Sequence, residues 1–161
     1  MRIRAELEHP AQGLASAFLR AIAEDDPAAV WERLSRETRG LLEGLHAARA
    51  GHALHEAAAP DAVDRLREVL APLRASALEV LGGPERLGRF GVSGTRVVDR
   101  QTAYVLLIPD VEKEGLLTEA DWRPAHLIAF VHESREWLID LGRTAALSAE
   151  AGLPDPLGIV R

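Results

Sequence analysis

The spacing of apolar residues changes near Gly91, and this change constrains the fold more than any other feature of the sequence. Before Gly91, apolar residues recur at three- and four-residue steps, as from Val63 to Val80, which predicts amphipathic helices. After Gly91, short β-rich segments are separated by hairpin-sized gaps, which predicts antiparallel strands. We therefore expect an α+β fold in which N-terminal helices pack on an antiparallel sheet of four or more strands.

Capping residues and prolines divide the helical half. Apolar spacing predicts a helix over residues 10–24. Asp26 and Pro27 are typical of an N-cap and first helical position, so they predict a second, short helix. A third helix is expected after Ser35. A longer helix should begin after Asp61, with a kink or a break at Pro72.

The second half predicts four strands, and residues 1–161 are expected to form one domain. Residues 1–90 should be mainly helical and residues 91–142 should form the antiparallel sheet. Residues 143–161 are predicted to be a C-terminal tail, whose last ten residues contain two prolines that exclude a helix. The predicted strands are Val92–Val98, Ala103–Pro109, Pro124–His132 and Trp137–Leu141.

Composition excludes several classes of function. A formal net charge of −6 argues against nucleic acid or an anionic membrane as partner, because lysine and arginine hold both. The chain has no cysteine, so disulfides, thiolate zinc sites and cysteine nucleophiles are excluded. We find no cofactor motif and no apolar run of signal-peptide or membrane-spanning length, so we expect a cytoplasmic protein without a cofactor.

Two stretches resemble the nuclear-transport-factor-2-like, or cystatin-like, superfamily: FLRAIAEDDPAAVW at residues 18–31 and REWLIDLG at residues 135–142. The resemblance implies helices cradled against a strongly bent sheet, forming a cone with a pocket on the concave face. Branches of the superfamily isomerise, dehydrate, cyclise or only bind small molecules, and the sequence assigns no branch. The ketosteroid-isomerase-like branch uses an Asp base with a Tyr and a protonated Asp, and this set does not map onto the chain.

His126, Asp140 and Tyr104 are the candidate catalytic residues. Strand alternation places His126 and His132 on one face, and Asp140 on the adjoining strand could supply the carboxylate that tunes a histidine base. Tyr104, the only tyrosine, would polarise the substrate. In the alternative interpretation, His126 is an ordinary strand residue and Asp140 makes a surface ion pair or a structural hydrogen bond.

Other side chains are weaker candidates for ligand or metal binding. Trp122, Phe130 and Trp31 could stack on a ligand, or serve only as core and rim aromatics. His52, His55 and Glu56 are the only cluster with ligand types suited to a metal, but their spacing matches no known zinc motif and a solvated helix end explains them as well.

The preferred interpretation of function is non-catalytic binding of a small apolar or amphipathic molecule in a helix-lidded pocket, or a structural role. One alternative is an acid–base enzyme of the isomerase or dehydratase type, and another is a protein–protein interaction module. Both faces of the predicted sheet carry apolar residues, as at Val105 with Leu106. Because the helices should cover only one face, the sequence predicts a homodimer that packs sheet against sheet.

Overall fold

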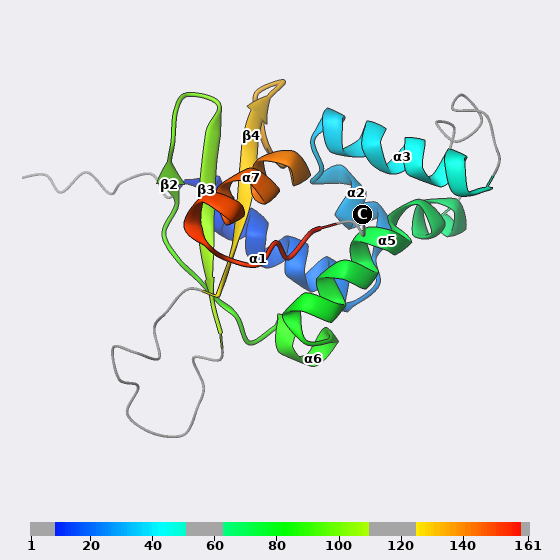
Figure 1. Cartoon of the computed structure of the whole chain (residues 1–161), viewed down its shortest axis with the longest axis horizontal. Helices are drawn as coiled ribbons and strands as arrows, with labels where there is room; N and C mark the ends of the chain where they lie inside the picture. Colours follow the sequence, from blue (N-terminus) through cyan, green and yellow to red (C-terminus); the bar gives the residue numbers. More distant parts are fainter. Residues whose placement is uncertain (1–8, 51–62, 110–124, 159–161) are drawn as a thin grey trace, which may run out of the picture.

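Helices and a curved antiparallel sheet build the chain in the computed structural model, which describes residues 9–50, 63–109 and 125–158 (Figure 1). The predicted α+β class is confirmed. The helices are α1 (Pro10–Ala23), α2 (Pro27–Glu32), α3 (Arg36–Ala50), α5 (Val63–Leu81), α6 (Pro84–Leu87) and α7 (Leu141–Ala151). The strands are β1 (Gly91–Val92), β2 (Arg96–Val97), β3 (Thr102–Ile108), β4 (His126–Glu133) and β5 (Glu136–Ile139).

The sheet has the order β1-β3-β4-β5, and β2 also pairs with β3, so that the strands form a strongly curved half-barrel. All pairings are antiparallel. The predicted strand 92–98 is divided into β1 and β2, because the Ser93 side chain interrupts the pairing with β3. Its hydroxyl oxygen accepts the Leu106 N–H at 2.8 Å in place of a backbone carbonyl.

Helix α1 packs against the concave face of the sheet. Its apolar stripe places Phe18 and Ile22 in one core with Val105, Ile128 and Phe130, and all five side chains are buried. Strand alternation explains the sheet side of this core, since the register brings alternate residues of β3 and β4 to the same face. This arrangement is consistent with the cone-like form that the resemblance implies.

The helical breaks are close to the predicted positions. Asp26 caps α2 through a 3.2 Å bond from the Ala29 N–H to its carboxylate, and Pro27 occupies the first turn. Pro72 lies inside α5, which continues as one helix to Leu81 and is not split. A single proline is tolerated there because tertiary packing of Val69, Leu70 and Leu73 outweighs the loss of one backbone hydrogen bond.

Helix α7 corrects the expected end of the chain. The predicted last strand extended to Leu141 and the tail began at 143, but β5 ends at Ile139 and residues 141–151 are helical. Asp140 is the N-cap of α7, and Gly152 ends the helix in the left-handed region at φ 70°. The remaining segment from 153 to 158 is non-helical, as its prolines predict.

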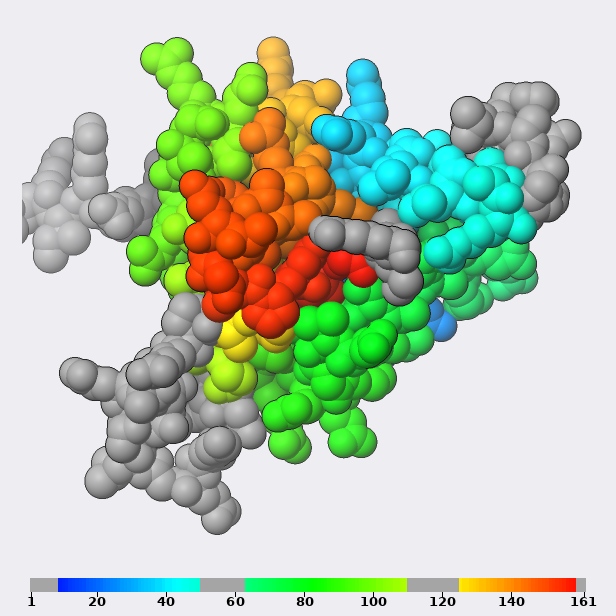
Figure 2. Space-filling model, in the orientation of Figure 1, coloured from blue at the N-terminus to red at the C-terminus, as the bar shows by residue number. Residues whose placement is uncertain are grey.

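Helix α7 lies on the opposite face of the sheet from α1 (Figure 1) and is at the front of the molecule in Figure 2. The Arg143 guanidinium donates to the Thr102 hydroxyl at 2.6 Å, and the Thr144 hydroxyl accepts the Ala129 N–H at 3.0 Å. This helix therefore covers part of the face that the sequence analysis left for a second subunit. The homodimer stays a prediction. Its reason, an uncovered apolar face of the sheet, no longer applies to the part of that face that α7 covers.

The segment after α7 crosses toward α5 (Figure 1). Leu157 is fully buried in the main core, and the Ser76 hydroxyl of α5 donates to the Gly158 carbonyl. Within the described ranges, we find no helix with the length and hydropathy needed to cross a bilayer.

Candidate functional site

Asp140 is held in a buried polar junction between α3, β5 and α7. Its carboxylate is 4% exposed, accepts the Ser35 hydroxyl at 2.8 Å through Oδ2, and accepts the Arg143 N–H at 2.8 Å through Oδ1. Ser35 is in turn 2.9 Å from the Thr38 hydroxyl, which accepts the Leu141 N–H at 3.0 Å. Both carboxylate oxygens are therefore engaged in bonds that fix the ends of two helices.

Backbone hydrogen bonds tie the same junction together. The Ser35 N–H donates to the Ile139 carbonyl at 2.8 Å, and the Ile139 N–H donates to the Arg33 carbonyl at 2.7 Å. The segment before α3 thus continues the sheet beside β5. Of the alternatives for Asp140, the structural hydrogen bond matches this geometry. The sequence identified Ser35 and Thr38 as the start of the third helix, but no local signal reports their bonds to Asp140 and Leu141.

The three candidate catalytic residues are not brought together. His126 pairs with Leu107 and shares the face of Ile128, whereas Tyr104 pairs with Ala129 on the other face. The Asp140 N–H bonds to the Ala129 carbonyl, three residues along β4 from His126, which corresponds to roughly 10 Å of strand. These positions leave no common point at which the three side chains could contact one substrate atom.

His126 is buried at the start of β4, where only 8% of it is exposed. Its Nδ1 lies 3.3 Å from the Pro154 carbonyl, and its ring is edge-on to Phe90 with centroids 6.0 Å apart. Burial lowers the pKa of His126, because the charged imidazolium loses its hydration, and the bond to the Pro154 carbonyl offsets this only in part. The folded chain therefore favours the neutral ring.

Acidification is expected to weaken the fold through His126. The unfolded chain binds a proton at this imidazole at a higher pH than the folded chain, so stability falls as the pH drops from the unfolded to the folded pKa. This one group changes the free energy of unfolding by at most about 1.4 kcal/mol per pH unit. Urea unfolding of wild type and His126→Gln across this range measures it, with the His126 imidazole followed by NMR. A His126 pKa at or above that of the unfolded chain would contradict the prediction.

The aromatic and metal candidates divide between core, surface and the part of the chain outside the described ranges. Phe130 is fully buried in the core, and Trp31 is partly buried with the Arg39 guanidinium 5.5 Å from its ring centre. Trp122, His52, His55 and Glu56 lie outside the described residues. Among residues 9–50, 63–109 and 125–158, no three histidine, aspartate or glutamate side chains form a group that could hold a metal ion.

The concave face of the sheet is filled where a cone pocket was expected. Phe18 and Ile22 of α1, Leu73 of α5 and Phe130 of β4 are at most 1% exposed and belong to one core. A ligand between α1 and this part of the sheet would have to displace these side chains. The candidate space for a ligand therefore lies elsewhere.

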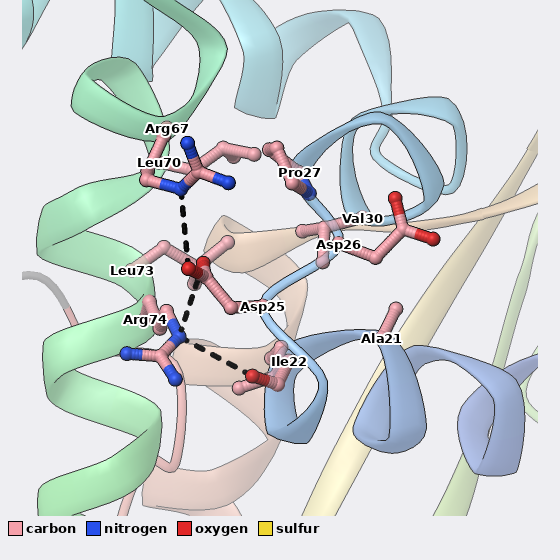
Figure 3. Close-up of a pocket in the computed structure, with 10 residues that line it drawn as sticks. All are labelled: Ala21, Ile22, Asp25, Asp26, Pro27, Val30, Arg67, Leu70, Leu73 and Arg74. Atoms are coloured by element: carbon pink, nitrogen blue, oxygen red, sulfur yellow. Dashed lines mark hydrogen bonds and ion pairs between the residues drawn. The ribbon is translucent and has the colours of Figure 1, made fainter. Parts of the chain in front are cut away.

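A small pocket of about 20 Å³ lies where the α1–α2 break meets α5 (Figure 3). Asp25, in the left-handed region at φ 53°, accepts Arg67 Nε at 3.1 Å and pairs with Arg74 Nε at 3.5 Å. Arg74 Nε also donates to the Ile22 carbonyl at 3.3 Å. The polar groups are thus used to hold α5 against the break, and the space is about that of one water molecule.

A larger groove of about 390 Å³ lies on the outer face of the sheet, between β3 and α7. Four leucines provide its apolar surface, and Arg96, Tyr104 and Glu150 add polar groups. The guanidinium, the phenol hydroxyl and the carboxylate have no hydrogen-bond or ion-pair partner among the described residues. The leucines are Leu106 and Leu127 of the sheet, Leu147 of α7 and Leu153 after it.

This groove holds one of the sequence candidates and adds residues that sequence analysis missed. Tyr104 was identified by its type alone, whereas Leu147 and Glu150 lay in the supposed tail. Leu147 and Glu150 are three positions apart, which places them on one face of a helix, and this spacing was the available signal. Comparisons of the chain with protein-family models, curated proteins and solved structures found no match.

Proposed function

We propose that this protein binds a small amphipathic molecule, without transforming it, in the groove between α7 and the outer face of the sheet. The observation that carries the proposal is a volume of about 390 Å³ with an apolar floor and three unpaired polar side chains. Ligand pockets are typically about 300–1,000 Å³, mostly apolar, with a few polar groups that orient the ligand.

The polar groups define the kind of molecule that fits. Arg96 offers a guanidinium for an anionic group, Tyr104 offers a hydroxyl, and Glu150 offers an acceptor for a donor group of the ligand. An apolar chain would lie against the four leucines of the groove. Because the lining has no nucleophile beside a base, binding is the chemistry that this set of side chains supports.

The curved sheet with a helix in its concavity is consistent with the proposed relationship to the nuclear-transport-factor-2-like superfamily. That relationship rests on the two sequence stretches quoted above. The proposed ligand site differs from the concave pocket that the resemblance implies, since the filled core occupies that position and the groove lies under α7.

Octanoate provides the test of the groove, because it joins an apolar chain to a carboxylate. Titration followed by amide NMR should shift Tyr104, Leu106 and Leu147 in a saturable manner. Leu147→Glu places a charge on the apolar floor and should weaken binding about 10- to 100-fold, the effect of losing one buried leucine contact. Ala149→Glu, which introduces the same charge at an exposed position of α7, is the control.

Two results would reject the proposal. One is equal octanoate affinity of wild type and Leu147→Glu, with thermal unfolding showing that both remain folded. The other is a set of shifted amides that excludes β3 and α7. Octylammonium, with the opposite charge, reports whether Arg96 or Glu150 orients the polar group.

A further inference from the structure

Another pocket, of about 120 Å³, lies at the start of β4, on the opposite face of the sheet from the groove, and shares no lining residue with it. The end of α5, the chain around α6 and the first residue of β4 enclose it. Its surface combines apolar side chains with three nitrogen-bearing ones: Leu81, Phe90 and Pro109 with Arg86, Arg89 and His126. His126, which lines this pocket, is only 8% exposed.

The Pro154 carbonyl determines which nitrogen of His126 can accept a hydrogen bond. A carbonyl oxygen only accepts, so the Nδ1 atom 3.3 Å away must carry the proton. Burial favours the neutral ring, and with the proton on Nδ1 the neutral ring has its lone pair on Nε2. No partner for Nε2 exists among the described residues. A buried imidazole on the pocket wall thus offers an unused acceptor.

Arg86 and Arg89 supply positive charge at the same pocket. Neither guanidinium has a hydrogen-bond or ion-pair partner among the described residues, although the chain as a whole has an excess of six acidic charges. Gly82 makes room for Arg86: with φ at 89°, a Cβ atom on Gly82 would lie 2.6 Å from Arg86 Cδ. The glycine therefore lets the Arg86 side chain fold across the end of α5.

We infer that this pocket binds a small hydroxycarboxylate. The two guanidinium groups hold the carboxylate, for which arginine has matching donor geometry. A hydroxyl of the ligand donates to His126 Nε2, and the short carbon skeleton contacts Leu81, Phe90 and Pro109. The volume of about 120 Å³ is below the usual range of about 300–1,000 Å³ for ligand pockets, which restricts the ligand to a short molecule.

Lactate is the probe, and NMR titration of the full chain is the measurement. Lactate should shift the His126 imidazole and the Phe90 amide in a saturable manner. Propionate, which lacks the hydroxyl, should bind about 3- to 10-fold more weakly, as expected for one lost hydrogen bond. Lactamide, which lacks the charge, should show no saturation.

Variants distinguish lactate binding in this pocket from non-specific binding of anions to surface arginines. Arg86→Gln and Arg89→Gln should each weaken lactate binding at least about threefold, whereas Arg100→Gln, an exposed arginine elsewhere, should leave it unchanged. Equal affinity for lactamide, or full affinity in the Arg86→Gln/Arg89→Gln double variant, would overturn the inference. Inorganic phosphate binding as tightly as lactate would also overturn it, since the pocket would then recognise any oxyanion.

Discussion

Replacing Phe130 with alanine is expected to lower the free energy of unfolding by about 3–5 kcal/mol, the usual cost of removing a buried phenylalanine ring. Phe130 is fully buried and pairs with Ala103 on one side and Ile139 on the other, at the centre of the sheet. The ring has core neighbours from α1 and α5, so the cavity left by alanine cannot collapse easily. Urea unfolding followed by tryptophan fluorescence measures the loss.

Phe130→Leu is the control for this prediction, because it keeps most of the apolar volume and should cost about 1.5 kcal/mol or less. The pair of variants also decides whether Phe130 lines a ligand site. A side chain that only contacts a ligand would change affinity and leave the unfolding free energy within about 1 kcal/mol of wild type. That result would contradict the packed concave face described above.

Replacing Asp140 with alanine is expected to cost about 3 kcal/mol. Loss of the α7 N-cap contributes roughly 0.5–2 kcal/mol. The Ser35 hydroxyl, buried and 2.8 Å from the lost carboxylate oxygen, is left without its acceptor, which adds roughly 1–3 kcal/mol. Chemical denaturation measures the sum, and hydrogen exchange of α7 amides shows where the loss is greatest.

Asp26→Ala is the matched control, since Asp26 also caps a helix but is exposed. It should cost only about 1 kcal/mol. Equal effects of the two variants would show that the buried bond to Ser35 adds nothing. An Asp140→Ala protein as stable as wild type would contradict the assignment of Asp140 as a structural cap.

The Asp140 junction also shows why sequence analysis placed this residue wrongly. The stretch from Trp137 to Leu141 alternates in a way that fits a strand, and four of its residues do form β5 or pair beside it. The strand ends at Ile139 because Asp140 is the N-cap of α7, and the carboxylate of Asp140 is held by the Ser35 hydroxyl. Ser35 and Asp140 are 105 positions apart, and no local pattern reports that they meet.

In the candidate site, too, the sequence predicted local positions but not contacts between distant segments. Residue type and strand alternation correctly placed His126 on the face of Ile128, and they put Tyr104 in β3. They could not place these two side chains relative to α7, because the helix itself was missing from the prediction. The groove exists only because α7 folds back over the sheet, and the position of the proton on Nδ1 of His126 depends on the Pro154 carbonyl, 28 positions away.

The sequence by itself determined the features that depend on neighbours within a few residues. These are the amphipathic stripe of α1, the Asp26–Pro27 start of α2, the alternation of β3 and β4, and the non-helical segment after Gly152. Caps, prolines and apolar spacing act through local hydrogen bonds and backbone angles, so the pattern is readable along the chain. Only the tertiary structure decided which faces are covered. Side chains of α1 fill the concave face and α7 lies on the other, because burial depends on contacts between segments that are distant in sequence.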